Sequence, residues 1–89
     1  MIQQAITISN KLGLHARASA KLTKLAGSFP CEVWVSRGSR RVNAKSIMGM
    51  MTLAAGIGTE ITLETSGERE QEAMQALVDL INDKFGEGE

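Results

Sequence analysis

Three stretches of the chain alternate apolar and polar residues with the period of two that is typical of half-buried strands, namely residues 2–8, 31–35 and 60–65. The turn-forming residues 36–39 join the second stretch to a short run at 40–42, and this arrangement predicts a hairpin. The pattern therefore predicts four strands.

Apolar residues recur at helical spacing in two longer stretches, one beginning after His15 and one spanning residues 68–85. The apolar positions are Ala18, Leu22, Leu25 and Phe29 in the first and Ala73, Leu77, Leu80 and Ile81 in the second. Gly27 and Pro30 are typical signals for the end of the first helix. A third, shorter helix is predicted at 47–55, with Ser46 as its N-cap.

The predicted order is strand, helix, strand, strand, helix, strand, helix. Each strand has one polar face and each long helix one polar stripe, so the economical packing is two layers, with the helices on one side of a sheet. We expect an α+β fold in a single domain spanning residues 1–89, with residues 86–89 as a frayed tail.

Composition removes several classes of function. Ten basic and ten acidic side chains give no net charge, which argues against nucleic-acid binding driven by phosphate neutralisation. Cys31 is the only cysteine, so no internal disulfide is possible, and we expect it to be a small buried apolar group. The N-terminus does not resemble a signal segment and no apolar run approaches ~20 residues, so we expect a cytoplasmic protein that does not insert into membranes.

His15 is the only histidine, and it stands directly before the first predicted helix. The first turn of a helix offers unpaired N–H groups and the positive end of the dipole, which together attract anions. Arg17 adds a guanidinium that matches phosphate oxygens, and a neutral imidazole is a usable nucleophile near neutral pH. A histidine at the N-cap and an arginine in the first turn are both locally unfavourable, and an anion explains both. The sequence therefore predicts a phosphate carrier.

Two motifs resemble the HPr family, the histidine-containing phosphocarrier proteins of the bacterial phosphotransferase system. They are Lys11-Leu12-Gly13-Leu14-His15-Ala16-Arg17 and Asn43-Ala44-Lys45-Ser46-Ile47-Met48-Gly49. Chain length, element order and motif separation agree with this resemblance. It implies a two-layer open-faced sandwich, in which a four-stranded antiparallel sheet of order 1-4-2-3 is covered on one face by three helices.

The resemblance also implies the activity. His15 would accept a phosphoryl group on Nδ1 from phosphorylated enzyme I, which draws it from phosphoenolpyruvate, and would pass it to enzyme IIA domains. Arg17 would help to hold the group. The protein would be a monomeric stoichiometric shuttle without a metal or cofactor, rather than a stand-alone enzyme. One departure is Ala18, where the family commonly has proline, and this bears on partner preference and rigidity more than on phosphoryl acceptance.

Ser46 matches the serine that a dedicated kinase, HPr kinase/phosphorylase, phosphorylates as a regulatory mark in part of the family. This role is compatible with an N-cap, because a phosphate is tolerated at a helix start. The resemblance further implies a docking patch beside His15, with an apolar centre and a charged rim. The centre would be Ile47, Met48 and Met51, and the rim Arg17, Lys24 and Lys45. Ile47 and Met51 also fit a purely gap-filling role at helical spacing, whereas Met48 does not.

Three alternatives remain open at this level. A hydrolase or nuclease built on His15 has little support, because no second histidine and no evident catalytic triad or metal set accompany it. A regulatory module that binds partners without carrying phosphate is a second alternative. Within the carrier class, the sugar-uptake branch, which we favour slightly on the motif around Ser46, competes with the nitrogen-related branch (NPr).

Overall fold

Four strands form one antiparallel sheet in the computed structural model, which describes residues 1–87. They are β1 (Ile2–Thr7), β2 (Glu32–Arg37), β3 (Arg40–Asn43) and β4 (Glu60–Ser66). Their order is β1-β4-β2-β3, so β4 lies between β1 and β2 while β2 and β3 form the expected hairpin. The expected strand order is confirmed.

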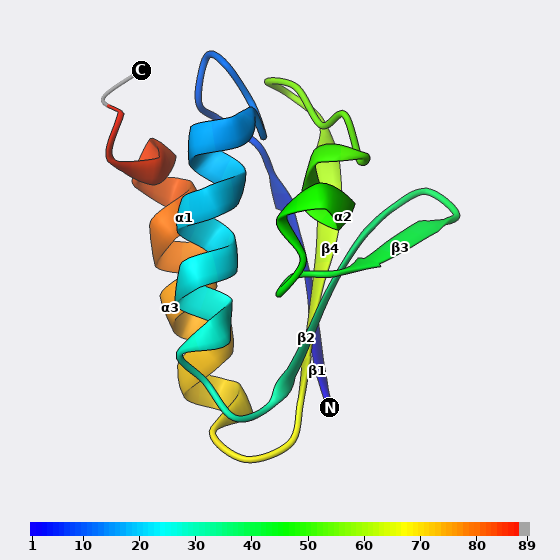
Figure 1. The fold of residues 1–89 in the computed structure, drawn as a ribbon, viewed down its shortest axis with the longest axis vertical. Coiled ribbons are helices and arrows are strands. Elements are labelled where there is room, and N and C mark those ends of the chain that lie inside the picture. Colours follow the sequence, from blue (N-terminus) through cyan, green and yellow to red (C-terminus); the bar gives the residue numbers. More distant parts are fainter. Residues whose placement is uncertain (88–89) are drawn as a thin grey trace.

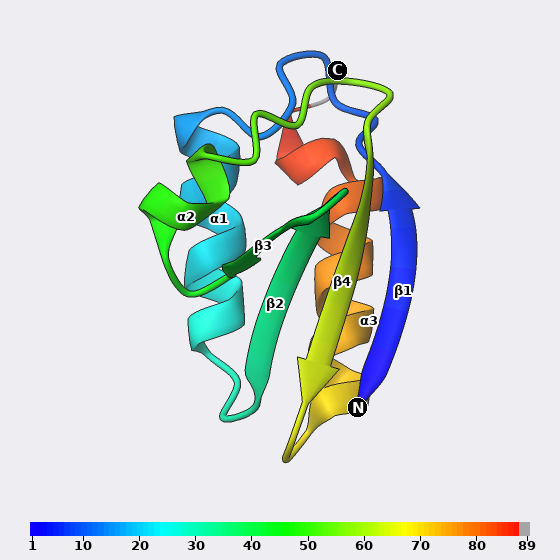
Figure 2. The same ribbon diagram turned by 90° about the vertical axis from the view of Figure 1, so that its right-hand side faces the viewer.

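The helices are α1 (Ala16–Gly27), α2 (Ile47–Met51) and α3 (Glu70–Asn82), followed by the single 3-10 turn η1 (Lys84–Gly86). Figure 1 shows α1 and α3 side by side on one face of the sheet. Turned by 90°, the molecule shows the strands in front of these two helices and α2 beside α1 (Figure 2). α2 packs against α1 and β3. This two-layer α+β arrangement confirms the predicted fold class.

One apolar core lies between the two layers, and the alternation of the strands supplies its sheet side. Ile61 and Leu63 of β4 are buried against Leu22 of α1 and Leu77 of α3, and all four are at most 1% exposed. Cys31 is buried as a free thiol, as expected. Burial of these aliphatic side chains is the main force that holds the helices on the sheet.

α2 is shorter than the stretch 47–55 that the sequence predicts, because the chain leaves the helix after Met51. Thr52 caps the end, and its hydroxyl donates to the carbonyl of Gly49 at 2.7 Å. Arg37 Nη1 then donates to the carbonyls of Leu53 (2.9 Å) and Ala54 (2.8 Å). The hairpin side chain thereby satisfies carbonyls after the helix, and the segment turns toward the core instead of continuing α2.

The chain end also differs from the prediction. α3 ends at Asn82, and Lys84 and Phe85 both have positive φ angles, of 54° and 55°, which reverse the chain. Phe85 is buried in the core and its carbonyl accepts a hydrogen bond from Lys21 Nζ at 2.5 Å. Gly86 and Glu87 are therefore held in place, in contrast to the frayed tail expected at 86–89. Gly88 and Glu89 lie outside the described residues.

Candidate functional site

His15 occupies the N-cap position of α1 with extended backbone angles, φ −73° and ψ 179°. Its side chain makes no capping hydrogen bond to the first turn, and it retains 27% exposure. The backbone is fixed on the helix side, because the amide of Ser19 donates to the His15 carbonyl at 2.8 Å. The ring is thus left beside the positive end of the helix rather than being used as a cap.

Hydrogen bonds from backbone amides and from one side chain hold the loop before His15. The Gly13 amide donates to the Asn10 carbonyl at 3.2 Å, and Asn10 Nδ2 donates to the Gly13 carbonyl at 2.8 Å. The Leu14 amide donates to the carbonyl of Ala55, in the segment after α2, at 2.9 Å. These bonds fix the direction in which the chain enters α1, and with it the position of the imidazole.

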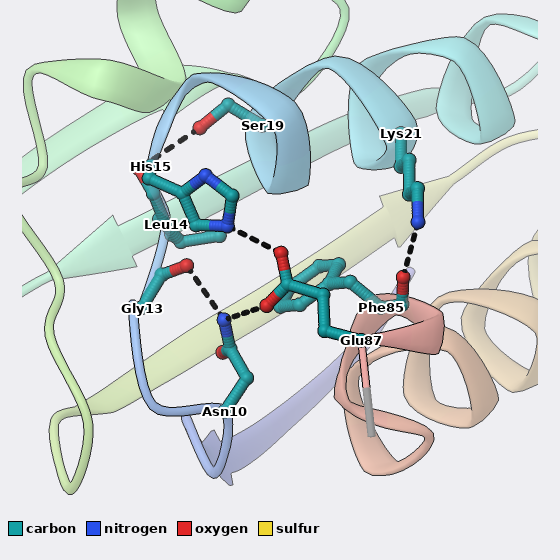
Figure 3. Close-up of polar contacts among 8 residues, drawn as sticks. All are labelled: Asn10, Gly13, Leu14, His15, Ser19, Lys21, Phe85 and Glu87. Atoms are coloured by element: carbon teal, nitrogen blue, oxygen red, sulfur yellow. Dashed lines mark hydrogen bonds and ion pairs between the residues drawn. The ribbon is translucent and has the colours of Figure 1, made fainter. Parts of the chain in front are cut away.

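A carboxylate from the chain end faces the imidazole. Glu87 Oε2 is hydrogen-bonded to His15 Nε2, and Glu87 Oε1 accepts a hydrogen bond from Asn10 Nδ2 at 2.9 Å (Figure 3). The hydrogen bond from Asn10, followed by that from His15, lowers the pKa of Glu87 below its ordinary value. The carboxylate is accordingly ionised at neutral pH, next to the ring.

Arg17 lies with His15 in one open hollow on the surface, as the sequence predicts. The other residues that line this hollow are Lys11, Leu12, Ala16, Gly86 and Glu87. Arg17 is exposed, and across residues 1–87 its guanidinium makes no hydrogen bond or ion pair. The donors of a rigid cationic fork are therefore available to an anion that binds at this end of α1.

Ser46 is the N-cap of α2, as predicted. Its Oγ accepts a hydrogen bond from the amide of Gly49 at 3.1 Å, and the residue is exposed. The hydroxyl therefore has a structural role at the start of a short helix while it remains accessible from solvent.

The α2 surface exposes three apolar side chains, with exposed fractions of 38% for Ile47, 71% for Met48 and 44% for Met51. Met50, in contrast, is fully buried and belongs to the core. Met48, the one of the three that a gap-filling role does not explain, is also the most exposed, and Ile47 and Met51 are exposed as well rather than buried as gap-filling groups.

The three cations expected around this apolar surface lie in different surroundings. Arg17 lines the hollow at His15, whereas the ammonium of Lys45 donates to the carbonyl of Phe29 at 3.0 Å. Lys24 lines a shallow groove with Leu25 of α1 and Leu80 of α3. The structure thus brings Arg17, but not Lys24, to the same hollow as His15.

Sequence reasoning missed Asn10 and Glu87 as site residues. Glu87 falls within the tail expected at 86–89, and no motif in the sequence singles out Asn10. The contact between Glu87 and His15 spans 72 positions, so no local pattern signals it. A fully buried asparagine is a signal only once burial is known, since buried polar groups need partners.

The described residues offer neither a metal site nor a helix that could span a membrane. Among the described residues, no group of three His, Cys, Asp or Glu side chains is placed to hold a metal ion. Over this part of the chain there is also no helix with the length and apolar character needed to cross a bilayer.

Comparison with known proteins places the chain among bacterial phosphocarriers. The family model described as "PTS HPr component phosphorylation site" matches residues 2–83, a segment that includes Asn10, His15 and Ser46 and ends before Glu87. The phosphocarrier protein HPr of Cupriavidus necator is 66% identical over 89 residues, which is all of both chains.

Two solved structures show the same fold. HPr-C-His from Thermoanaerobacter tengcongensis has a TM-score of 0.94 at 47% identity, with 98% of each chain covered. An HPr dimer from the same organism has a TM-score of 0.79 at 47% identity and covers 98% of this chain and 100% of that chain.

Proposed function

The chain belongs to the HPr family of phosphocarrier proteins of the phosphotransferase system, and we propose that His15 is the residue that carries the phosphoryl group, on Nδ1. The observation that carries this proposal is the position of His15, with its ring at the start of α1 and in the same hollow as the exposed Arg17. Nε2 is occupied by Glu87, so Nδ1 is the ring nitrogen left for a phosphoryl group.

Charge stabilisation at this site is moderate, and this suits a carrier. The first turn of α1 and the side chain of Arg17 attract the oxygens of the transferring group. Positioning and charge stabilisation of this kind account for most of the catalysis of phosphoryl transfer. Both lie on an open surface where water screens them, so the group is released as readily as it is accepted.

We further propose enzyme I as the phosphoryl donor and enzyme IIA domains as acceptors. The exposed Ile47, Met48 and Met51 support a docking patch on α2, because exposed flexible apolar groups suit a surface that meets several partners. Lys24 and Lys45 would contribute charge at its edges. A carrier has to present one face alternately to donor and acceptor, so we propose that this chain acts as a monomer in the cytoplasm.

Ser46 is the proposed site of regulatory phosphorylation by HPr kinase/phosphorylase. Its hydroxyl is exposed, and it adjoins Ile47 and Met48 in the chain. A phosphate on Ser46 would sit at the start of α2, where negative charge is tolerated. It would change docking through repulsion of an acidic partner without unfolding the domain.

The test of the carrier role is incubation with enzyme I, Mg²⁺ and labelled phosphoenolpyruvate, with wild type compared to His15→Ala. We expect an acid-labile, base-stable label on wild type that is absent from His15→Ala. Absence of label on wild type, with enzyme I shown to be active on another HPr, would refute the proposal. Transfer of the label to enzyme IIA domains of the sugar and nitrogen branches then identifies the acceptors.

A further inference from the structure

The carboxylate of Glu87 is placed to control which nitrogen of His15 carries the proton. We propose that Glu87 is a positioning residue for phosphoryl transfer, which holds His15 in the Nε2–H form and stabilises the positive ring that forms when Nδ1 is phosphorylated. This inference rests on the proposed role of His15, but it concerns a residue beyond the segment matched by the family model.

Asn10 fixes the orientation of this carboxylate. Both protons on Asn10 Nδ2 are used, one toward the Gly13 carbonyl at 2.8 Å and one toward Glu87 Oε1 at 2.9 Å. A flipped amide would direct Oδ1 at two other acceptors, so the donor orientation is the one the site permits. Asn10 is fully buried, so its side chain has a fixed position. Because it binds Oε1 of Glu87, the other carboxylate oxygen, Oε2, is directed toward the imidazole (Figure 3).

The chain end is built to deliver Glu87 to this position. The buried ring of Phe85 anchors the turn, and Lys21 Nζ donates to the Phe85 carbonyl. The Glu87 amide donates to the Lys84 carbonyl at 3.0 Å. The Glu87 side chain is only 15% exposed. These contacts distinguish it from a carboxylate on a loose terminus that meets the ring by chance.

An ionised carboxylate only accepts hydrogen bonds, so the Nε2 that faces it has to carry a hydrogen. In the neutral ring the lone pair is then on Nδ1, which points away from the carboxylate (Figure 3). Orientation of an imidazole by a hydrogen bond to its other nitrogen is a general way to fix the reactive tautomer.

The group-transfer step balances without a proton leaving the ring. The Nδ1 lone pair forms the bond to phosphorus while the bond between phosphorus and the donor breaks, and its electron pair stays with the donor. The ring retains its Nε2 proton and becomes positively charged, and the Glu87 carboxylate neutralises this charge. On transfer to an acceptor the N–P electron pair returns to Nδ1, and the neutral Nε2–H form is restored.

The direct test is the tautomer of His15, measured by ¹⁵N NMR on the full chain without any partner protein. We expect the Nε2–H form to dominate in wild type and a mixture of tautomers in Glu87→Ala and Glu87→Gln. Glu72→Gln is the control, because it removes an exposed carboxylate that pairs with Arg69 on α3. Wild-type tautomer ratios in both Glu87 variants would overturn the proposal.

The functional test is the rate of phosphoryl acceptance from enzyme I at fixed pH. We expect a loss of about 10-fold in Glu87→Ala, with Glu72→Gln at the wild-type rate, when both variants are assayed well below their thermal midpoints so that unfolding does not contribute. An unchanged or higher rate in Glu87→Ala would overturn the positioning role. Absence of label on wild type would instead refute the carrier role of His15, so the two failures are distinguishable.

Discussion

Gly13 packs directly against the backbone of Ala55. A Cβ atom at position 13 would lie 2.5 Å from the Ala55 carbonyl oxygen and 2.7 Å from the α-carbon of Gly56. The same carbonyl accepts the hydrogen bond from the Leu14 amide. The loop that carries His15 and the segment after α2 therefore meet backbone to backbone, where a side chain has no room.

Gly13→Ala is expected to lower the free energy of unfolding by about 2–4 kcal/mol, because the new methyl group clashes with backbone and φ is +65°. Urea denaturation measures this loss. Gly38→Ala is the matched control, since φ is +59° but no atom lies within 4 Å of the added Cβ, and it should cost about 1 kcal/mol. Equal losses in the two variants would show that the contact with Ala55 has no energetic role.

Ser46→Ala is expected to destabilise the protein by about 1 kcal/mol, because the amide of Gly49 loses its acceptor at the start of α2. Ser46→Asp retains an acceptor and should restore most of this loss. Ser39→Ala is the control, because Ser39 is exposed in the β2–β3 turn and its hydroxyl makes no hydrogen bond within residues 1–87. A stability of Ser46→Ala equal to that of Ser39→Ala would contradict the cap.

The parts of the structure that sequence reasoning found are those encoded locally. The alternation in 60–65 predicts β4 because every second side chain faces the core. The position of His15 before α1 and the capping role of Ser46 follow from the same local logic, since helix starts have recognisable residue preferences. The position of Arg17 near His15 follows from their spacing of two residues, because both then lie at the same end of α1.

The remaining parts depend on contacts between distant segments. α2 ends early because Arg37 of β2 binds the carbonyls that follow it, and the apolar run around Leu53 gives no sign of this. Glu87 stands between two glycines in a segment typical of a tail, and only the burial of Phe85 and Asn10 reveals why it is held. Tertiary packing overrides local propensity at these positions.

The stability of the protein is expected to fall as pH drops below about 4.5, the ordinary value for a glutamate. Glu64 is one cause: hydrogen bonds from Gln3 and then Arg41 lower its pKa. A folded-state pKa below the unfolded-state value stabilises the fold above the unfolded value, and this contribution is lost as pH falls through the folded value.

Glu64→Gln should therefore reduce stability at pH 7 and flatten the decline of stability between pH 7 and pH 3, as measured by urea unfolding at a series of pH values. Glu32→Gln is the control, because in the described part of the chain its carboxylate makes no hydrogen bond or ion pair. If Glu64→Gln retained the full wild-type pH slope, Glu64 would have no part in acid sensitivity.

Substitutions of Met48 and Met50 are expected to have different effects, the first on docking and the second on stability. Met48→Ala should change the free energy of unfolding by less than about 0.5 kcal/mol, because the side chain is 71% exposed, but should raise the KM for transfer from enzyme I. Met50→Ala should cost about 2–4 kcal/mol, because the side chain is fully buried. An unchanged KM in Met48→Ala would remove Met48 from the proposed docking patch.

Arg17→Ala is expected to change activity and stability in opposite directions. The guanidinium has no hydrogen-bond or ion-pair partner among the residues that the structure describes, and a cation in the first turn of α1 opposes the helix dipole. Its removal should therefore raise the free energy of unfolding by a few tenths of a kcal/mol, at about the scale of a dipole interaction. The rate of phosphoryl acceptance should fall, since the transferring group loses a charged donor.

We expect Arg17→Lys to recover part of the rate, because it keeps the charge but not the fork of donors. Arg69→Ala is the control, since it removes an exposed guanidinium at the start of α3, where it pairs with Glu72 and does not line the hollow at His15. Rates of acceptance from enzyme I and urea unfolding on the same samples give both quantities. Substitution of a residue that stabilises the fold would lower the stability of the protein, whereas substitution of a residue that binds an anion lowers only its activity. A loss of stability in Arg17→Ala with an unchanged rate would therefore contradict the role proposed for Arg17.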